Sequence, residues 1–348
     1  MSHGYNGVGW TPFKKQYDRW MLAGVGIYLV SFILVSNLSQ PQGDSFTPIQ
    51  VLMRATGTLA FVMLTFILCI GPLARLTPRF KPFLFNRRHI GVTTFLIGFV
   101  HAALATLWYH AFSDVNPFAS ILASNPRYES ISGFPFESLG LVALIILFLM
   151  AATSHDFWNT NLGPSLWKTL HMLVYLAYGL LIAHVALGAI QFEKHPLYFG
   201  LLCGGAAIVT GLHLVSIFVG ASSIDRLTHD GWIEVANALD LQDGCAKIIR
   251  PPKGEAIAVF RDGNEVSAVS NVCRHQGGPL GEGRIIDGCI TCPWHGFQYR
   301  MADGQSPPPY TEKIATYATQ IINGFVFVNP DPNPPGTPQA PSLIGDAA

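Results

Sequence analysis

The stretch CITCPWHGF, residues 289–297, contains two cysteines and one histidine within seven positions. Upstream, the stretch CRHQGGPL at 273–280 contains another cysteine and another histidine, separated by a single residue. Thiolates and imidazoles are the side chains that suit transition metals such as zinc, copper and iron. The two stretches together predict one metal site with ligands from two segments of the chain.

The spacing supplies two thiolates and two imidazoles: Cys273-x-His275, sixteen further residues, and then Cys292-x-x-His295. Zinc accepts such a set of ligands. So does a [2Fe–2S] cluster in which one iron has two cysteine ligands and the other has two histidine ligands. Glycine follows each pair, which lets backbone amides approach cluster sulfides closely, and the residue pattern favours the cluster over zinc.

At these residues the sequence resembles the Rieske ferredoxins, whose signature is C-x-H, a spacer of fifteen or more residues, and C-P-W-H-G. The resemblance covers residues 231–330 and implies a Rieske-type [2Fe–2S] cluster in a small β domain. The metal ligands that it implies are Cys273, His275, Cys292 and His295. Cys289 falls outside this set, and we expect it to be a buried strand cysteine.

The resemblance also implies a low reduction potential. High-potential Rieske proteins of cytochrome bc complexes have an extra cysteine in each loop, joined by a disulfide; Gly278 and Trp294 stand in those places here. A serine that donates a hydrogen bond to a sulfide in that group is replaced by Phe297. Fewer hydrogen bonds to sulfur stabilise the reduced cluster less, and the missing disulfide suits a reducing cytoplasm.

Rieske oxygenases add a long domain with a mononuclear iron site, and the few residues after Pro330 predict no oxygenase chemistry here.

Only 12% of the 348 residues are charged and 50% are hydrophobic, whereas soluble domains average roughly a quarter charged residues. Six runs lack Asp, Glu, Lys and Arg: 20–43, 55–74, 89–113, 138–155, 169–192 and 195–224. Each has about 18 residues or more and can cross a bilayer as a helix. A cleaved signal peptide is the alternative for the first run, but no A-x-A-like cleavage pattern follows it.

Positive residues predict the orientation of these helices, because cytoplasmic loops are enriched in Lys and Arg. They precede the first run and crowd the loop between the second and third: Lys14, Lys15, Arg19, Arg75, Arg79, Lys81, Arg87 and Arg88. The protein is expected in the inner (plasma) membrane. With six crossings, both of its termini are expected in the cytoplasm.

The equal numbers of basic and acidic residues, 21 each, argue against a nucleic-acid partner.

After Asp225 short apolar runs alternate with Gly, Asp and Asn turns, which predicts an antiparallel β domain. A proline-rich segment from Asn329 onward predicts an extended, disordered tail. The predicted fold is therefore multi-domain, an all-α six-helix transmembrane bundle followed by a small all-β Rieske domain. The predicted parts are a cytoplasmic N-terminal segment 1–19, a six-helix domain 20–222, a linker 223–230, the Rieske domain 231–330 and a disordered tail 331–348.

Several histidines fall within the predicted spans, where an ionisable residue is costly and marks a functional site by default. The stretches RRHIGVTTFLIGFVH and LWKTLHMLVYLAYGLLIAH resemble the third and fifth helices of the ferric-reductase-like transmembrane family, over residues 50–220. This resemblance implies b-type haem with ligands among His101, His171 and His184. Fuller members have a second ligand on helix three where this chain has Val115, so we expect one haem and leave a second possible.

Depth supports the pairing of His101 with His184. At 1.5 Å per residue, His101 lies about 20 Å beyond Arg88 and His184 about 24 Å beyond Lys168. His171 lies within about 5 Å of the inner boundary, where with His89 it could flank a second haem. Thirteen residues at about 100° each place His171 and His184 roughly 140° apart on an ideal helix, so either this helix is distorted or only one of the two is a ligand.

The predicted function is membrane electron transfer, as an oxidoreductase component. Electrons would pass from a cytoplasmic reductase or ferredoxin, through the cluster and the haem, to a quinone or an extracytoplasmic acceptor. The sequence has no G-x-G-x-x-G element, which indicates a separate protein as donor. Two alternatives remain: reversed flow from quinol to a cytoplasmic oxygenase partner, and a redox sensor without turnover.

Overall fold

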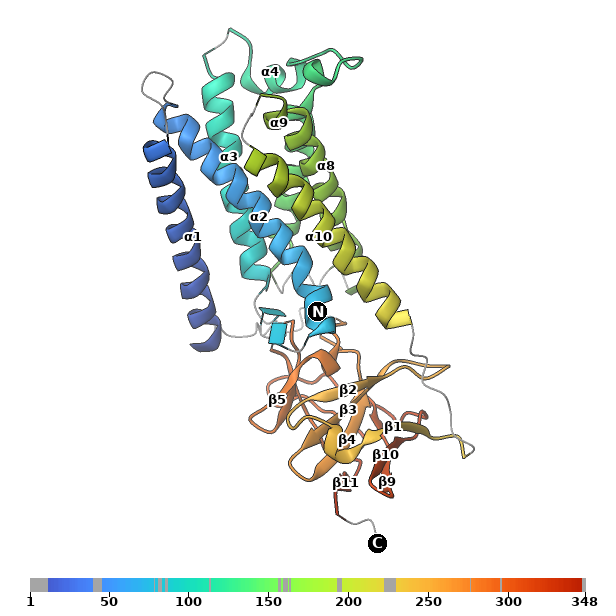
Figure 1. The fold of residues 1–348 in the computed structure, drawn as a ribbon. Helices are drawn as coiled ribbons and strands as arrows, with labels where there is room; N and C mark the ends of the chain where they lie inside the picture. The colour runs from blue at the N-terminus through green and yellow to red at the C-terminus, as the bar shows by residue number, and fades with distance from the viewer. Residues whose placement is uncertain are drawn as a thin grey trace. The chain divides into compact units, whose positions relative to one another are not determined.

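The computed structural model divides the chain into a helical unit and a second unit that contains the strands (Figure 1). The described residues are 12–39, 46–77, 79–80, 83–84, 87–112, 114–155, 158, 162, 164–192, 196–221, 230–275, 277–294 and 296–345. The first of the predicted parts, 1–19, is described from residue 12, where a helix already begins. The predicted linker 223–230 lies, except for Asp230, outside the described residues.

Apolar helices build the first unit. They are α1 (Pro12–Ser39), α2 (Pro48–Leu76), α3 (Arg87–Tyr109), α4 (Pro117–Ala123), α5 (Phe136–Ala152), α7 (Pro164–Met172), α8 (Val174–Leu187), α9 (Ala189–Phe192) and α10 (Pro196–Ala221). Among the described residues, five segments are long and apolar enough to span a membrane: Lys15–Leu38, Pro48–Leu76, Arg87–Tyr109, Leu166–Gln191 and Pro196–Phe218. Helix α5, with 17 residues, is at the lower limit of about 17 residues for a span.

The predicted count of six helices is wrong. Helix α4 is a short addition outside the charge-free runs, and the single fifth helix that the pattern predicted is divided into α7, α8 and the short α9. At the division, Leu173 N–H donates to the carbonyl of Leu170, 3.1 Å away and only three residues back. The ideal angle between His171 and His184 therefore does not apply, because the helix is interrupted between them.

Large apolar side chains cover the outside of the helices. Leu38, Phe99 and Phe218 are 85%, 55% and 71% exposed. Toward the inside, small residues such as Ala55 and Ala143 are fully buried. Exposed apolar surface is unfavourable in water and is the normal outer face of a helix surrounded by lipid, so these helices have the surface of a membrane domain.

In the second unit, the residues that the structure describes form three antiparallel sheets. Its strands are β1 (Ile233–Asn237), β2 (Ala246–Ile249), β3 (Ile257–Asp262), β4 (Glu265–Ser270), β5 (Arg284–Ile286), β6 (Cys289–Thr291), β7 (Gln298–Arg300), β8 (Thr316–Tyr317), β9 (Thr319–Ile322), β10 (Phe325–Val328) and β11 (Ser342–Leu343). The sheet orders are β1-β10-β9, β11-β4-β3-β2 with β8 on β4, and β5-β6-β7. The predicted all-β domain is confirmed.

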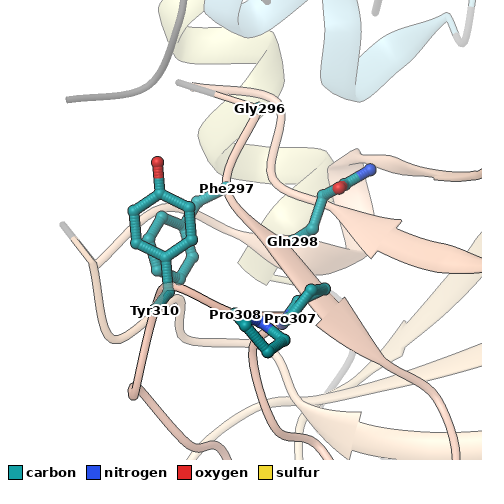
Figure 2. A pocket seen from close by; sticks show the side chains of 6 residues that line it. All are labelled: Gly296, Phe297, Gln298, Pro307, Pro308 and Tyr310. Atoms are coloured by element: carbon teal, nitrogen blue, oxygen red, sulfur yellow. The ribbon is translucent and has the colours of Figure 1, made fainter. Parts of the chain in front are cut away.

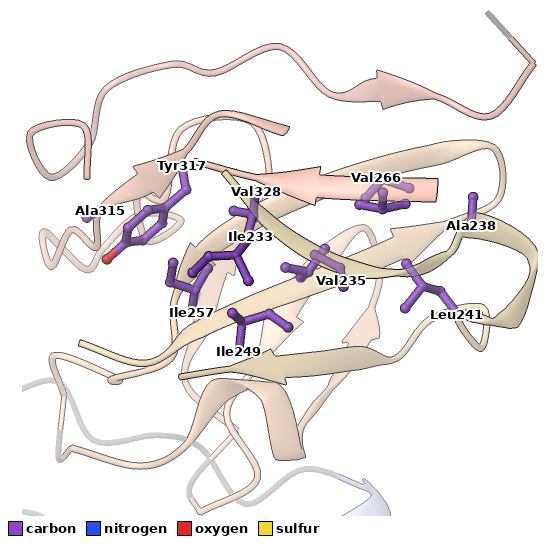
Figure 3. Close-up of a cluster of buried hydrophobic side chains, with 13 residues drawn as sticks. Ile233, Val235, Ala238, Leu241, Ile249, Ile257, Val266, Ala315, Tyr317 and Val328 are labelled. Atoms are coloured by element: carbon purple, nitrogen blue, oxygen red, sulfur yellow. The ribbon is translucent and has the colours of Figure 1, made fainter. Parts of the chain in front are cut away.

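Apolar residues of β1 to β4 fill a core shared by the β1-β10-β9 sheet and the five-stranded sheet. The fully buried side chains of this core include Ile233, Ile257 and Val328 (Figure 3). A second buried cluster belongs to the β5-β6-β7 side and includes Cys273, Cys292 and Tyr299. The metal site predicted from the sequence is thus built on its own small core.

A two-residue turn sets the register between β5 and β6 of the β5-β6-β7 sheet. Asp287 and Gly288 join β5 to β6, with φ angles of 52° and 70°, and Ile286 faces Cys289 across the turn. An Asp-Gly pair favours such a turn because both residues tolerate positive φ. The turn places Cys289 on β6 and leaves Cys292 as the first residue beyond that strand.

The predicted disordered tail, 331–348, is wrong for the described residues 331–345. Strand β11 pairs with β4, the N–H of Asn333 donates to the carbonyl of Thr316 at 2.9 Å, and the N–H of Gln339 donates to the carbonyl of Ala302 at 2.8 Å. Prolines interrupt regular structure, but they do not prevent an extended segment from pairing with the edge of a sheet. Residues 346–348 lie outside the described residues.

Candidate metal and haem sites

The first loop of the predicted metal site closes on its cysteine. Cys273 N–H donates to the carbonyl of Gly278 at 2.9 Å, and its own carbonyl accepts from the N–H of Gly277 at 2.6 Å. Gly277 has a φ of 70°, a left-handed conformation that glycine adopts without a steric penalty. Both sides of the cysteine's backbone are therefore held by the loop that follows it.

The second loop, between β6 and β7, repeats this arrangement. Cys292 N–H donates to the carbonyl of Phe297 at 2.8 Å, and its carbonyl accepts from the N–H of Gly296 at 2.9 Å. Gly296 has a φ of 74°. In both loops the partners are the residues four and five positions after the cysteine, so the two cysteines are presented by equivalent turns.

The two loops meet at Gly278. A Cβ at this position would lie 2.8 Å from Cys292 Sγ and 3.1 Å from the ring of Trp294, so only glycine fits. Gly278 and Trp294 stand where the resembled high-potential Rieske proteins have a disulfide, and here the ring of Trp294 lies against Gly278. The side chains of Cys273 and Cys292 are both buried, 1% and 0% exposed.

His275 also joins the loops, because its ring stacks on Phe297 of the second loop, with centroids 4.7 Å apart and planes 6° apart. His295 lies outside the described residues. Among the described residues no group of three or more His, Cys, Asp and Glu side chains stands in metal-binding geometry. The structure places the loop that contains Cys273 and His275 against the loop that contains Cys292. In the sequence His295 directly precedes Gly296 of the second loop.

Sequence reasoning missed Tyr299. Its hydroxyl lies 3.4 Å from Cys273 Sγ and accepts a hydrogen bond from the N–H of Arg274 at 2.9 Å. Burial raises the pKa of Tyr299, and the nearby Cys273 and Cys292 raise it further, so the hydroxyl keeps its proton and donates toward sulfur. The alternation of β7 was the available signal, since it turns Tyr299 inward. The sequence predicted fewer hydrogen bonds to the sulfur atoms of the cluster site. The Tyr299 hydroxyl nevertheless supplies one to Cys273 Sγ.

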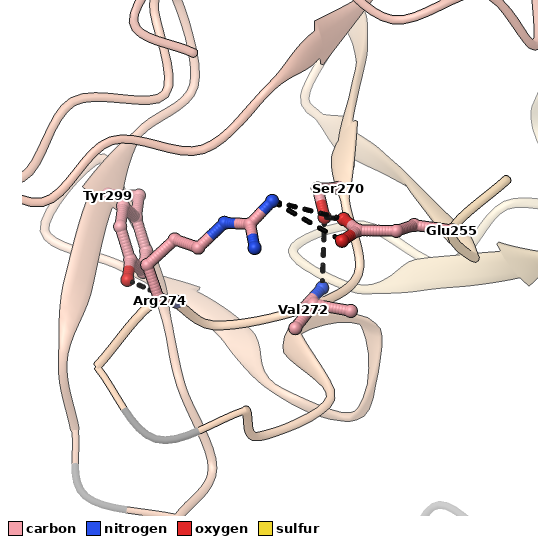
Figure 4. Close-up of polar contacts among 5 residues, drawn as sticks. All are labelled: Glu255, Ser270, Val272, Arg274 and Tyr299. Atoms are coloured by element: carbon pink, nitrogen blue, oxygen red, sulfur yellow. Dashed lines mark hydrogen bonds and ion pairs between the residues drawn. The ribbon is translucent and has the colours of Figure 1, made fainter. Parts of the chain in front are cut away.

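The chain entering the first loop is tied to Glu255 (Figure 4). Ser270 Oγ donates to this carboxylate at 2.7 Å and accepts from the N–H of Val272 at 3.2 Å. Arg274 pairs with the same carboxylate at 3.3 Å. Because both partners of this ion pair are more than two-fifths exposed, its stabilising effect is small, and its consequence is to direct the arginine away from the loops.

A hollow of about 100 Å³ lies beside the second loop (Figure 2). Its lining residues are Gly296, Phe297, Gln298, Pro307, Pro308 and Tyr310. Pockets for cofactors and drug-sized ligands occupy roughly 300–1,000 Å³. The hollow is therefore too small for a flavin or a nicotinamide.

In the helical unit, His101 on α3 and His184 on α8 are held in the same way. His101 Nδ1 lies 2.9 Å from the carbonyl oxygen of Met53 on α2. His184 Nδ1 lies 2.8 Å from the carbonyl oxygen of Phe136 on α5. A carbonyl can only accept, so each Nδ1 carries the proton and each Nε2 presents a lone pair. The two rings are also within electrostatic range of each other.

His171 on α7 has a different environment. Its Nδ1 donates to the carbonyl of Trp167 at 3.0 Å, and its ring stacks on the indole of Trp167 at 3.8 Å. Its Nε2 is buried and makes no hydrogen bond of normal geometry with the described residues, although the backbone of Met150 lies close to the ring. Since buried polar atoms nearly always have a partner, this nitrogen is a candidate ligand for an iron atom.

The remaining histidines of the helices are paired with protein groups. His89 Nδ1 lies 2.8 Å from the carboxylate of Asp18. His213 Nδ1 lies 2.8 Å from its own helix at the carbonyl of Val209, and its Nε2 lies 3.0 Å from the hydroxyl of Tyr175. The third, His110, is buried, with Nδ1 2.8 Å from the hydroxyl of Ser120 and Nε2 3.4 Å from Glu137. These three have protein partners and are weaker candidates for iron.

Comparisons with known proteins match the helical part and the strand-containing part of the chain to two different families. Residues 56–182 match the family model described as ferric reductase like transmembrane component, and residues 231–318 match the Rieske [2Fe-2S] domain. The protein-methionine-sulfoxide reductase heme-binding subunit MsrQ of Herminiimonas arsenicoxydans is 31% identical over 174 residues, 49% of this chain and 72% of that protein.

The C-terminal part has relatives of its own. The anthranilate 1,2-dioxygenase ferredoxin subunit of Burkholderia cepacia is 39% identical over 74 residues, 21% of this chain and 68% of that protein. A solved structure of the complex of reduced oxygenase and oxidized ferredoxin in carbazole 1,9a-dioxygenase matches with 26% identity and a TM-score of 0.29. That match covers 30% of this chain and 97% of the other.

Proposed function

Because the chain belongs to the ferric-reductase-like transmembrane family and carries a Rieske [2Fe–2S] domain, we propose that it transfers electrons between an iron–sulfur cluster and b-type haem in the membrane. The observation that carries the proposal is the presence in one chain of two equivalent cysteine loops and two carbonyl-bound membrane histidines. The membrane relative is named as a haem-binding subunit.

The cluster would be held by Cys273 and Cys292 on one iron and by His275 and His295 on the other. When bound, such a cluster accepts and releases single electrons. The protein keeps both thiols buried in an apolar core, excludes water from them with Trp294 and Phe297, and directs the Tyr299 hydroxyl at Cys273. These contacts set the potential through hydrogen bonding and burial.

The haem would be held by His101 and His184. Their Nδ1 hydrogen bonds leave the Nε2 atoms for iron, and such a bond also fixes the ring and raises its basicity as a ligand. Two imidazole ligands leave no coordination position open, which suits electron passage. The buried Nε2 of His171 is the ligand that a second haem would use.

For the path we propose a cytoplasmic reductase or ferredoxin as donor and a quinone or an extracytoplasmic protein as acceptor. Both termini would be cytoplasmic, since the arginine-rich segment between α2 and α3 marks the inner side. A reporter fused after Ala348 should behave as cytoplasmic. Labelling of that terminus from outside the cell would contradict both the orientation and the donor side.

Reversed flow is the second candidate, and the ferredoxin relative named as a dioxygenase subunit favours it. In that case quinol would reduce the haem, and the cluster would supply a cytoplasmic oxygenase. The two directions require opposite orders of midpoint potential.

A redox titration of purified full-length protein, followed optically and by electron paramagnetic resonance, tests both candidates. We expect a low-spin haem and a histidine-ligated cluster, with the cluster potential below that of the haem. A cluster potential above the haem potential would support reversed flow. Full cluster content without haem, under haem-replete expression, would refute the membrane half of the proposal.

A further inference from the structure

Two glycines lie directly against the histidines assigned to haem. A Cβ on Gly57 of α2 would stand 2.8 Å from Nδ1 and 2.9 Å from Cε1 of His101. A Cβ on Gly140 of α5 would stand 2.8 Å from the same two atoms of His184. We infer that Gly57 and Gly140 are a matched pair of positioning residues that orient the two axial imidazoles of one haem. This inference rests on the proposed haem function.

Each glycine stands four residues after the carbonyl that holds the histidine. Met53 precedes Gly57, and Phe136 precedes Gly140, by the same interval. In an α-helix the carbonyl of residue i accepts from the N–H of residue i+4, so the side chain at i+4 stands close to that oxygen. Removing this side chain opens the second lone pair of the carbonyl to a ring from the neighbouring helix. The glycine and the hydrogen bond are thus two parts of one arrangement.

The edge of each ring that faces the glycine is the Nδ1–Cε1 edge. This contact places Nδ1 at the carbonyl and leaves Nε2 on the other side of the ring, available for iron. An alanine would push the ring off the carbonyl. The histidine would then lose the bond that selects its tautomer and orientation.

None of the other helical glycines whose surroundings the structure describes faces an imidazole ring. Gly98 of α3 would meet Leu144 at 3.9 Å and Ala60 at 4.0 Å, and Gly205 of α10 would meet Phe61 at 3.2 Å. These are contacts of apolar helix packing. At Gly57 and at Gly140, the three atoms nearest to an added Cβ all belong to the imidazole ring. Alanine would form a more stable helix, so the absence of a side chain at these two positions points to a role in placing the rings.

The test compares Gly57→Ala and Gly140→Ala with Gly71→Ala on α2 and Gly179→Ala on α8, where an added Cβ meets nothing within 4 Å. Haem affinity and the low-spin haem resonance are measured on purified full-length protein, with the cluster resonance as a measure of folding. We expect each of the first two variants to lower haem affinity about 10- to 100-fold and to shift the same low-spin resonance. The two control variants should match the wild type.

A second measurement covers poor folding of Gly57→Ala. In a His101→Gly background the clash is absent, and added imidazole can occupy the vacated ligand position. Adding Gly57→Ala to that background should weaken imidazole binding to the haem by about tenfold or more, again the size of an orienting contact. Equal imidazole affinity in both backgrounds would overturn the inference.

The other outcomes separate this inference from the function beneath it. A haem-loaded wild type, with Gly57→Ala and Gly140→Ala indistinguishable from the controls, overturns the inference and leaves the proposed function standing. The same holds if the two variants alter two different haem signals. A wild type without haem refutes the proposed function, and the inference fails with it.

Discussion

The two proposed redox sites differ in the sequence separation between each proposed ligand and the group that orients it. In the cluster loops, the partners of Cys273 and Cys292 are four and five residues away. In the helical unit, the carbonyls that hold His101 and His184 are each 48 residues away. Both sites use a repeated arrangement, but one is local and the other depends on how neighbouring helices pack. The backbone bonds that orient the proposed ligands therefore lie within one loop at the cluster, whereas at the haem they join two helices.

The largest expected effect is at the local site. Cys292→Ala or Cys273→Ala should abolish the cluster, because each iron needs all of its protein ligands, and iron content with the reduced-state resonance measures this. Cys289→Ser is the matched control, since Cys289 lies on β6 opposite Arg300 and outside the loop. Loss of the cluster in Cys289→Ser, with retention in Cys292→Ser, would reverse the ligand assignment.

The haem should be lost, or become five-coordinate and high-spin, in His101→Ala and in His184→Ala, because each removes one of two axial ligands. Optical spectra of the purified variants show the change directly. The control is His213→Ala, since both nitrogens of His213 have protein partners. An unchanged low-spin spectrum in His184→Ala would show that α8 does not supply a ligand.

His171→Ala separates one haem from two. If the wild type holds two haems, this variant should lose one and keep the spectrum of the His101–His184 haem. If the wild type holds one, haem occupancy should fall only modestly. Haem-to-protein ratios measure either result, with His89→Ala as control because His89 is paired with Asp18. Loss of all low-spin haem in His171→Ala would instead assign His171 to the principal haem.

The smallest effect is expected from Tyr299→Phe. A hydrogen bond to sulfur stabilises the more electron-rich reduced cluster, and a net loss of about 1 kcal/mol corresponds to a decrease of roughly 40 mV in the potential of a one-electron couple. A redox titration of the cluster resonance measures it. Tyr317→Phe, a buried tyrosine of the other core, should leave the potential unchanged. A higher potential in Tyr299→Phe would contradict the direction of the hydrogen bond.

The cluster loops could be read from the sequence because their determinants are contiguous. The cysteine, the histidine and the glycines at fixed offsets are all within six residues of one another, and the structure has both loops closed by the bonds that these glycines permit. Tyr299 was overlooked because its hydroxyl reaches the other loop, and Cys273 is 26 residues away.

Charge-free runs predicted the membrane helices, because the apolar length needed to cross lipid is a property of each segment alone. The same runs could not show the break at Leu173, the short helices α4 and α9, or the pairing of β11 with β4. These depend on neighbouring elements that supply or remove hydrogen-bond partners.

Residue types and spacings alone therefore determined the class of each site: two thiolates with two imidazoles for a cluster, and histidines at membrane depth for haem. Only the tertiary structure decided which nitrogen of His101 and His184 is available, and which side chain had to be absent at Gly57 and Gly140. The physical reason is that the chemical type of a ligand depends only on its own side chain. Its orientation depends on a carbonyl and a glycine of a different helix, which only the packing of the helices brings next to it.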